Sequence, residues 1–147
     1  MIRSVLVVCV GNICRSPLGE RMLAQALPQI RVASAGLGAV VGAGADPDTA
    51  AVAAEIGVAL DGHVARQLTE EIGRDHDLIL VMEPGHRAEV GRRFAQFSGR
   101  TMLFDHWTGG QGIADPFRKP LDAHREARDR IAAAAEGWIR RLQDRQG

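Results

Sequence analysis

The sequence contains no tyrosine, only two cysteines and no excess of charge of either sign. Its 147 residues carry 18 basic and 18 acidic side chains, so charge does not favour a nucleic acid or a membrane surface as partner. Two cysteines cannot form a disulfide framework, and free thiols favour a reducing compartment. The first ten residues do not resemble a secretory signal, and no apolar run approaches the ~18 to 20 residues that span a bilayer. We therefore expect a cytoplasmic protein that does not insert into a membrane.

Apolar runs alternate with amphipathic segments along the chain. Four runs have the composition of strands covered on both faces, and they lie at 5–10, 30–35, 78–82 and 101–104. The last helix is predicted from one apolar face, which consists of Ile131, Ala134, Ala135, Trp138, Ile139 and Leu142. No linker, repeat or low-complexity segment interrupts the pattern. It predicts one α/β domain over residues 1–147, with a doubly wound, four-stranded parallel sheet and helices on both faces.

Three features of the sequence concern the helices: two indicate where a helix begins, and one is a glycine that destabilises a helix. Pro17 suits the first position of the first helix, where its missing N–H costs nothing. Asp46 and Pro47 are typical of a helix N-cap and first turn, and we expect apolar residues as far as Ile56 to face inward from that helix. Gly137, inside the last helix, costs about 1 kcal/mol relative to alanine. We expect burial of the neighbouring tryptophan to offset this cost.

The stretch CVGNICRSP, residues 9–17, separates the first predicted strand from the first helix. A five-residue turn that leads into a helix N-terminus can point its backbone N–H groups inward and form a concavity for an anion. Gly11 and Asn12 tolerate the left-handed backbone that such a turn needs. Arg15 adds a planar fork for two anion oxygens, and these positive groups favour the thiolate form of Cys9. The loop is therefore predicted to bring a thiolate nucleophile and a phosphate site together.

A second candidate group follows the last predicted strand. A thiolate that attacks a phosphoryl group needs an acid to protonate the leaving group and a base to activate water, and one carboxyl group can serve both steps. Asp115 is the best candidate, because its loop follows a strand at the same edge of the sheet as Cys9. Phe117 could stack on an aromatic leaving group. The alternative is that Asp115 and Pro116 only initiate a turn.

The stretch from Cys9 to Pro17, together with Asp115-Pro116-Phe117, strongly resembles the low-molecular-weight protein tyrosine phosphatases. The similarity extends from the first strand to the last helix. It implies that Cys9 is the nucleophile, Arg15 the phosphate clamp and Asp115 the general acid and then base. The implied activity is hydrolysis of phosphotyrosine through a phosphocysteine intermediate, without a cofactor.

The resemblance also implies supporting roles. The expected phosphate-binding loop includes Val10, Gly11, Asn12, Ile13, Cys14 and Ser16. In this family the hydroxyl that matches Ser16 steadies the thiolate, and the residue that matches Asn12 holds the loop through groups that match Ser34 and His63. Animal members wall the cleft with an aromatic residue where this chain has Leu37, so we expect Leu37 and Phe117 to form the cleft wall.

Four further segments are similar to one bacterial branch of the family, and they lie at 34–38, 45–47, 62–67 and 103–107. This branch is paired with tyrosine autokinases that drive capsule and exopolysaccharide export. The resemblance implies that the partner is the tyrosine-rich tail of such a kinase, and we expect a monomer. No metal site is expected, because the five histidines show no ligand spacing with each other or with the thiols.

Three alternatives stay open. Cys14 is either a packed thiol or a partner that forms a reversible disulfide with oxidised Cys9. Arsenate reductases share this fold and a similar loop, but they relay a disulfide through further cysteines, which the chain lacks beyond Cys14. A non-catalytic phosphate- or phosphotyrosine-binding module is also conceivable, although it would not need the acid at Asp115.

Overall fold

The protein has a four-stranded parallel sheet in the order β2-β1-β3-β4. The computed structural model describes residues 1–146, and the side chains of residues 1–143. The strands are β1 (Ser4–Cys9), β2 (Arg31–Gly36), β3 (Leu78–Val81) and β4 (Thr101–Leu103). Because β1 pairs with β2 on one side and with β3 on the other, the strand order reverses next to β1. The predicted α/β sheet is confirmed, with each strand within one or two residues of its expected position.

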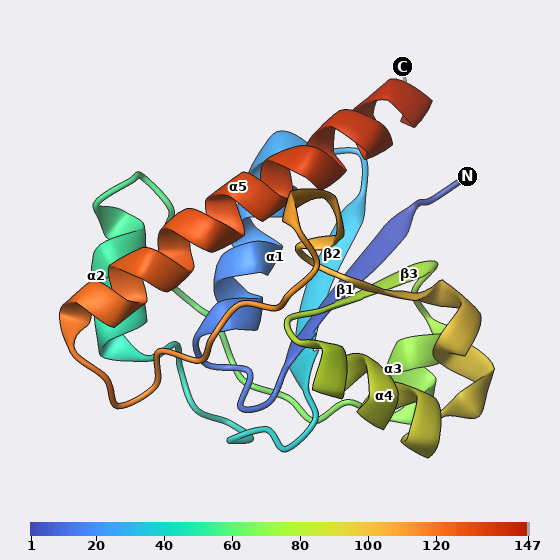
Figure 1. Cartoon of the computed structure of the whole chain (residues 1–147), viewed down its shortest axis with the longest axis horizontal. Coiled ribbons are helices and arrows are strands. Elements are labelled where there is room, and N and C mark those ends of the chain that lie inside the picture. The colour runs from blue at the N-terminus through green and yellow to red at the C-terminus, as the bar shows by residue number, and fades with distance from the viewer. Residues whose placement is uncertain (147) are drawn as a thin grey trace.

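Helices cover both faces of this sheet (Figure 1). One face carries α1 (Arg15–Ala26), α2 (Pro47–Ala54) and α5 (Leu121–Gln146). The other carries α3 (Glu70–Arg74), α4 (Pro84–Arg93) and the 3-10 helix η1 (Ala95–Arg100), and a short 3-10 turn, η2 (His106–Thr108), follows β4. No helix within residues 1–146 is long and apolar enough to cross a membrane.

The sequence of β1 contains a continuous apolar run because both faces of this strand are buried. Val5 and Val7 pack into the core on the side of α1 and α5, whereas Leu6 and Val8 pack into the core under α4 and η1. All four side chains are fully buried. Burial of each stabilises the fold by about 1.5 to 3 kcal/mol, so these four central positions of the strand must be apolar.

Two helix boundaries differ from the sequence prediction. α1 begins at Arg15, so Pro17 is its third residue rather than its first. Proline is tolerated there because the N–H groups of the first turn have no acceptor within the helix. Asp46 caps α2 as predicted, but the helix ends at Ala54, and Ile56 lies beyond it with 45% of its surface exposed. The expected inward position of Ile56 is therefore wrong.

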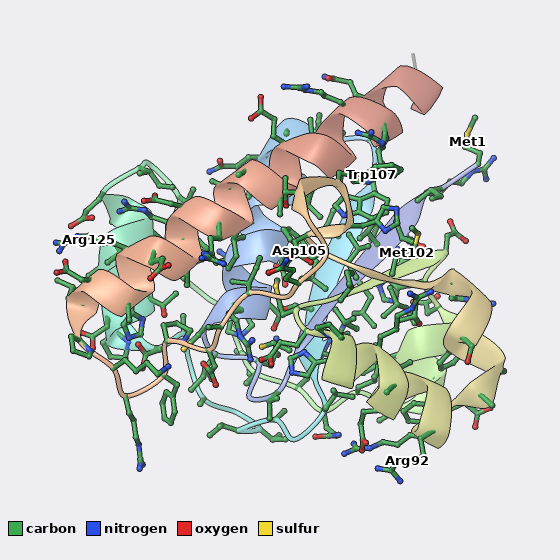
Figure 2. All side chains as sticks on the ribbon, in the orientation of Figure 1. Met1, Arg92, Met102, Asp105, Trp107 and Arg125 are labelled. Carbon is green, nitrogen blue, oxygen red and sulfur yellow. The ribbon has the colours of Figure 1, made fainter. Side chains whose placement is uncertain are left out.

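Gly137 is explained by a close contact that the sequence did not reveal. A Cβ atom at this position would lie 2.8 Å from the Cβ of Trp107, which packs against α5 (Figure 2). Trp107 also lies edge-on to Trp138, with 5.6 Å between ring centroids, and under the guanidinium of Arg141. Glycine is thus required for the approach of η2 to α5. Trp138 is buried as predicted, and its indole N–H donates to the carbonyl of Phe104 at 2.8 Å.

Candidate active site

The candidate site lies beyond the carboxyl end of β1, where the strand order of the sheet reverses. This is the usual ligand position in open α/β sheets. Cys9 ends β1 and Arg15 begins α1, so the loop of residues 10–14 joins a strand directly to a helix N-terminus. The loops after β1 and β2 and the loop before α5 gather at this edge, on the lower side of Figure 1. The predicted position of the loop is therefore the observed one.

Cys9 is buried, and its sulfur lies 2.9 Å from the hydroxyl oxygen of Ser16. The Nδ2 of Asn12 donates to the same hydroxyl oxygen at 2.8 Å. Since the Asn12 donor occupies a lone pair of the Ser16 oxygen, the Ser16 proton is free to point at the sulfur. A thiolate can only accept a hydrogen bond, so this arrangement supplies a donor for the ionised form of Cys9.

Asn12 anchors the loop from its centre. Its φ of 58° is left-handed, and its side chain is fully buried. Nδ2 also donates to the hydroxyl of Ser34 at 3.0 Å, while Oδ1 accepts from the backbone N–H of Arg66 at 2.9 Å. The Asn12 carbonyl lies 2.6 Å from the Nε2 of His63. Ser34 and His63 therefore contact the loop through Asn12, which is the arrangement that the family resemblance implies.

Arg15 is 98% buried beneath the loop, and its orientation is set by acceptors on two other segments. Its Nη1 forms an ion pair with Glu83 and donates to the carbonyl of Ile113 at 2.6 Å. Its Nε has no hydrogen-bond partner among the described residues. A buried donor without an acceptor is unfavourable by about 1 to 3 kcal/mol, and an oxyanion in the loop could satisfy it.

Glu83 was missed by the sequence analysis. It lies between β3 and α4, at the carboxyl end of the strand next to β1, and this position brings its carboxylate to Arg15. An acidic residue directly after a buried strand and before Pro84 was the available signal. Its partner His86 lies 3.6 Å away, and burial, with a further contribution from Arg15, lowers the pKa of that imidazole.

Asp115 both initiates a turn and faces the loop, so the two interpretations of its sequence are compatible. Oδ1 accepts from the backbone N–H of Phe117 at 3.0 Å, which fixes the carboxylate. Oδ2 lies 3.8 Å from the Nη2 of Arg15. The side chain remains 47% exposed, so it can exchange protons with water.

A cavity of about 210 Å³ brings these groups together. It is lined by Cys9, Val10, Gly11, Ile13, Cys14, Arg15, Gly38, Val40, Asp115 and Phe117. Leu37 is not among these residues, because it is 5% exposed and packs into the core under α4. The expected position of Leu37 in the cleft wall is therefore wrong, and Val40, which is half exposed, lines the cavity together with Phe117.

A larger hollow of about 560 Å³ lies elsewhere, between α3 and the start of β2. Its wall contains no cysteine, serine or threonine. Two of its charged residues neutralise each other, since Arg31 pairs with Asp75 at 3.2 Å. The smaller cavity at the loop is therefore the better candidate for catalysis.

Cys14 differs chemically from Cys9. Both thiols are free and buried. Burial raises the pKa of Cys14 to about 12, although a hydrogen bond with Thr49 opposes this shift. At neutral pH Cys14 is therefore almost entirely a protonated thiol, which makes it a slow nucleophile for disulfide formation. The packed-thiol interpretation of Cys14 fits this environment.

Comparison with known proteins agrees with this geometry. Residues 4–146 match the family described as low molecular weight phosphotyrosine protein phosphatase. The chain belongs to this family. It is 52% identical over 142 residues to the probable low molecular weight protein-tyrosine-phosphatase AmsI of Erwinia amylovora, which covers 97% of this chain and 99% of AmsI.

Solved structures of family members superimpose closely. The crystal structure of E. amylovora AmsI matches with a TM-score of 0.93 and 51% identity over 95% of this chain and 93% of that chain. The phosphatase Wzb of Escherichia coli K30 in complex with sulphate gives a TM-score of 0.95 at 40% identity, over 97% and 99% of the two chains. Vibrio vulnificus Wzb in complex with benzylphosphonate gives 0.94 at 41% identity, over 96% and 99%.

Proposed function

We propose that this chain is a protein tyrosine phosphatase that works through a phosphocysteine on Cys9. One observation carries the proposal. A buried sulfur with a hydroxyl donor at 2.9 Å shares a cavity of about 210 Å³ with Asp115 and with the anion-binding arginine. The relatives named above are tyrosine phosphatases by name, which supports the same reaction here.

The first step transfers the phosphoryl group to the enzyme. The Cys9 thiolate attacks phosphorus, an S–P bond forms and the P–O bond to the tyrosine ring breaks. The electron pair of that bond remains on the phenolic oxygen, and the carboxylic acid of Asp115 donates the proton that neutralises it. Arg15 and the backbone N–H groups of the loop stabilise the charge on the phosphoryl oxygens in the transition state.

The second step regenerates the enzyme. Asp115, now a carboxylate, takes a proton from a water molecule, and the oxygen of that water attacks phosphorus. The S–P bond breaks, its electron pair returns to Cys9 as a thiolate, and inorganic phosphate leaves. Ser16 stabilises this leaving thiolate by the hydrogen bond that Asn12 orients.

The cavity wall supports an aryl phosphate as substrate. Val40 and Phe117 present apolar surface above the loop, and a phenyl ring between them would place its phosphate toward Arg15 and the backbone amides. The Nε of Arg15, which has no partner among the described residues, would then bind a phosphate oxygen. Tyrosine fits these walls as the leaving group.

The cellular setting belongs to the same proposal. We propose that residues 1–147 form one domain, that the enzyme acts as a cytoplasmic monomer, and that its substrate is the phosphotyrosine-rich tail of a tyrosine autokinase of exopolysaccharide synthesis. The resemblance of the four segments at 34–38, 45–47, 62–67 and 103–107 to the bacterial branch supports this partner. Dephosphorylation of such a tail by the purified protein, compared with an unrelated phosphotyrosine peptide, tests the preference.

The activity itself is tested with p-nitrophenyl phosphate and a phosphotyrosine peptide. We expect the wild type to hydrolyse both, and we expect Cys9→Ser to bind vanadate or phosphate without turnover. Asp115→Asn should lower kcat by about 10² to 10⁴-fold, and less for leaving groups of low pKa. Turnover by Cys9→Ser near the wild-type rate would refute the covalent mechanism. Anion binding without turnover by the wild type would indicate a binding module, and arsenate reduction coupled to thiols would indicate a reductase.

A further inference from the structure

We propose that the protein has a second, non-catalytic site, which binds a divalent transition-metal ion of the zinc type between α2 and α5. Its ligands are Asp46, Asp48 and His124. One potential ligand atom from each residue lies within 4.8 Å of the others. The site does not depend on the proposed phosphatase activity, because none of the three side chains lines the catalytic cavity.

His124 carries the argument. Its side chain is completely buried, and its Nδ1 lies 2.9 Å from the hydroxyl oxygen of Thr49. Its Nε2 has no hydrogen-bond partner among the described residues and lies 3.9 Å from the Oδ2 of Asp48. When Nδ1 donates its proton to Thr49, the lone pair of Nε2 faces the carboxylate, which is the tautomer that binds a metal.

The spacing favours an ion between the two groups over a direct contact. A distance of 3.9 Å is too long for a hydrogen bond between Nε2 and Asp48. Zinc binds nitrogen and carboxylate oxygen at about 2.0 to 2.2 Å, so two tetrahedral ligands lie roughly 3.3 to 3.6 Å apart. Small rotations of the carboxylates would close this difference. Asp48 is 60% exposed, so an ion could enter from solvent, and water could complete the coordination.

Asp46 lies beside the same imidazole, on its Nδ1 side. Its Oδ2 accepts from the backbone N–H groups of Asp48 and Thr49 and lies 3.9 Å from the Nδ1 of His124, so this carboxylate must rotate to reach an ion bound at Nε2. Its own backbone N–H donates to the carbonyl of Ile13 at 2.8 Å. The proposed site is thus connected to the phosphate loop through one residue.

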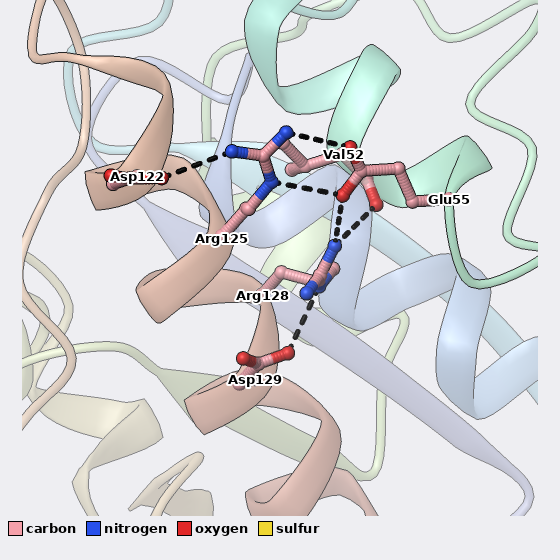
Figure 3. A network of polar contacts seen from close by, with 6 residues as sticks. All are labelled: Val52, Glu55, Asp122, Arg125, Arg128 and Asp129. Atoms are coloured by element: carbon pink, nitrogen blue, oxygen red, sulfur yellow. Dashed lines mark hydrogen bonds and ion pairs between the residues drawn. The ribbon is translucent and has the colours of Figure 1, made fainter.

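The helices that supply these ligands are fixed against each other by charged side chains. Glu55, just after α2, accepts from both Arg125 and Arg128 of α5 (Figure 3). Two hydrogen bonds join Arg125 to the carboxylate, at 3.1 and 2.9 Å. The ligands therefore come from rigid elements, and the conformational cost of metal binding is small. No metal-ligand spacing for this site is visible in the sequence, because β3 and β4 separate α2 from α5 along the chain.

The test is calorimetric titration with zinc chloride at pH 7.5, in a Cys9→Ser background that removes the catalytic thiol as a competing ligand. We expect one zinc ion per chain. Asp48→Asn in this background should weaken binding by about tenfold or more, whereas Asp61→Asn, which removes one exposed carboxylate elsewhere, should not. Zinc should also raise the melting temperature of the parent and not that of the Asp48→Asn protein. Absence of zinc binding, or equal affinities of the two asparagine variants, would overturn the proposal.

Discussion

Replacement of Asn12 by alanine measures how much the hydrogen bonds of this side chain contribute to the stability and activity of the phosphate-binding loop. The side chain makes three hydrogen bonds, to the hydroxyls of Ser16 and Ser34 and from the backbone N–H of Arg66. Asn12 is fully buried, so water cannot replace the lost groups without entering the core. The variant therefore leaves one backbone donor and two hydroxyls with fewer partners.

The expected loss of stability follows from these contacts. An unsatisfied Arg66 N–H costs about 1 to 3 kcal/mol, and loss of the bonds to the two hydroxyls costs about 0.5 to 1.5 kcal/mol each. The left-handed φ of 58° adds about 1 kcal/mol for alanine, which tolerates this region less well than asparagine. The sum is about 3 to 7 kcal/mol, which is a large part of the ~5 to 15 kcal/mol that typically stabilises a domain.

Urea unfolding and hydrolysis of p-nitrophenyl phosphate provide the two readouts. We expect Asn12→Ala to lower the unfolding free energy by the amount above, and kcat by about tenfold or more because Ser16 loses its orientation. Asn12→Gly is the matched control, since it removes the same bonds without the φ penalty, and it should be about 1 kcal/mol more stable than the alanine variant. An alanine variant within 1 kcal/mol of the wild type would refute the assignment of these bonds as the support of the loop.

Three further changes test other parts of the structure. Glu83→Gln should raise KM for aryl phosphates several-fold, because Arg15 loses its ion pair; an unchanged KM would show that the other acceptor of Arg15 suffices. Iodoacetamide at pH 7 should alkylate the catalytic thiol long before Cys14, whose pKa is raised to about 12. Cys14 should react only as the pH approaches that value. Peptide mass spectrometry measures the order of alkylation, and the opposite order would contradict this prediction. Gly137→Ala should destabilise the protein by about 1 to 3 kcal/mol in urea, since the added methyl group meets Trp107 at 2.8 Å, and a stabilised variant would mean that helix propensity prevails.

The fold was predictable because its signals are local. The four apolar runs reflect strands buried on both faces, as Leu6 and Val7 illustrate by packing into opposite cores. The capping role of Asp46 was equally visible, since its carboxylate bonds to residues two and three positions later. The start of α1 was misplaced because its first helical residue, Arg15, is buried by long-range contacts rather than selected by a cap.

The candidate site was predictable only in part, for a physical reason. Cys9, Ser16 and Arg15 lie in one short segment, so their proximity follows from a single loop, and the family resemblance supplied Asn12, Ser34 and His63. Glu83 reaches Arg15 only because β3 pairs with β1. The spacing of residues along the sequence does not predict which distant strands pair, so this contact could not be predicted.

Leu37 is a residue that the sequence analysis placed in the cleft wall and that the structure places elsewhere. Its backbone N–H donates to the carbonyl of Cys9 at 2.9 Å, so the residue is adjacent to the nucleophile in the chain fold. Nevertheless its side chain packs beside Ala35 into the core under α4 and does not line the cavity. Val40, after the glycine at 38, reaches the cavity instead. If Val40 forms the wall, Val40→Ala should weaken binding of aryl phosphates but not of inorganic phosphate, and Leu37→Ala should instead lower the unfolding free energy by about 2 to 5 kcal/mol. The reverse pattern in inhibition and urea-unfolding measurements would show that Leu37, and not Val40, forms the cleft wall.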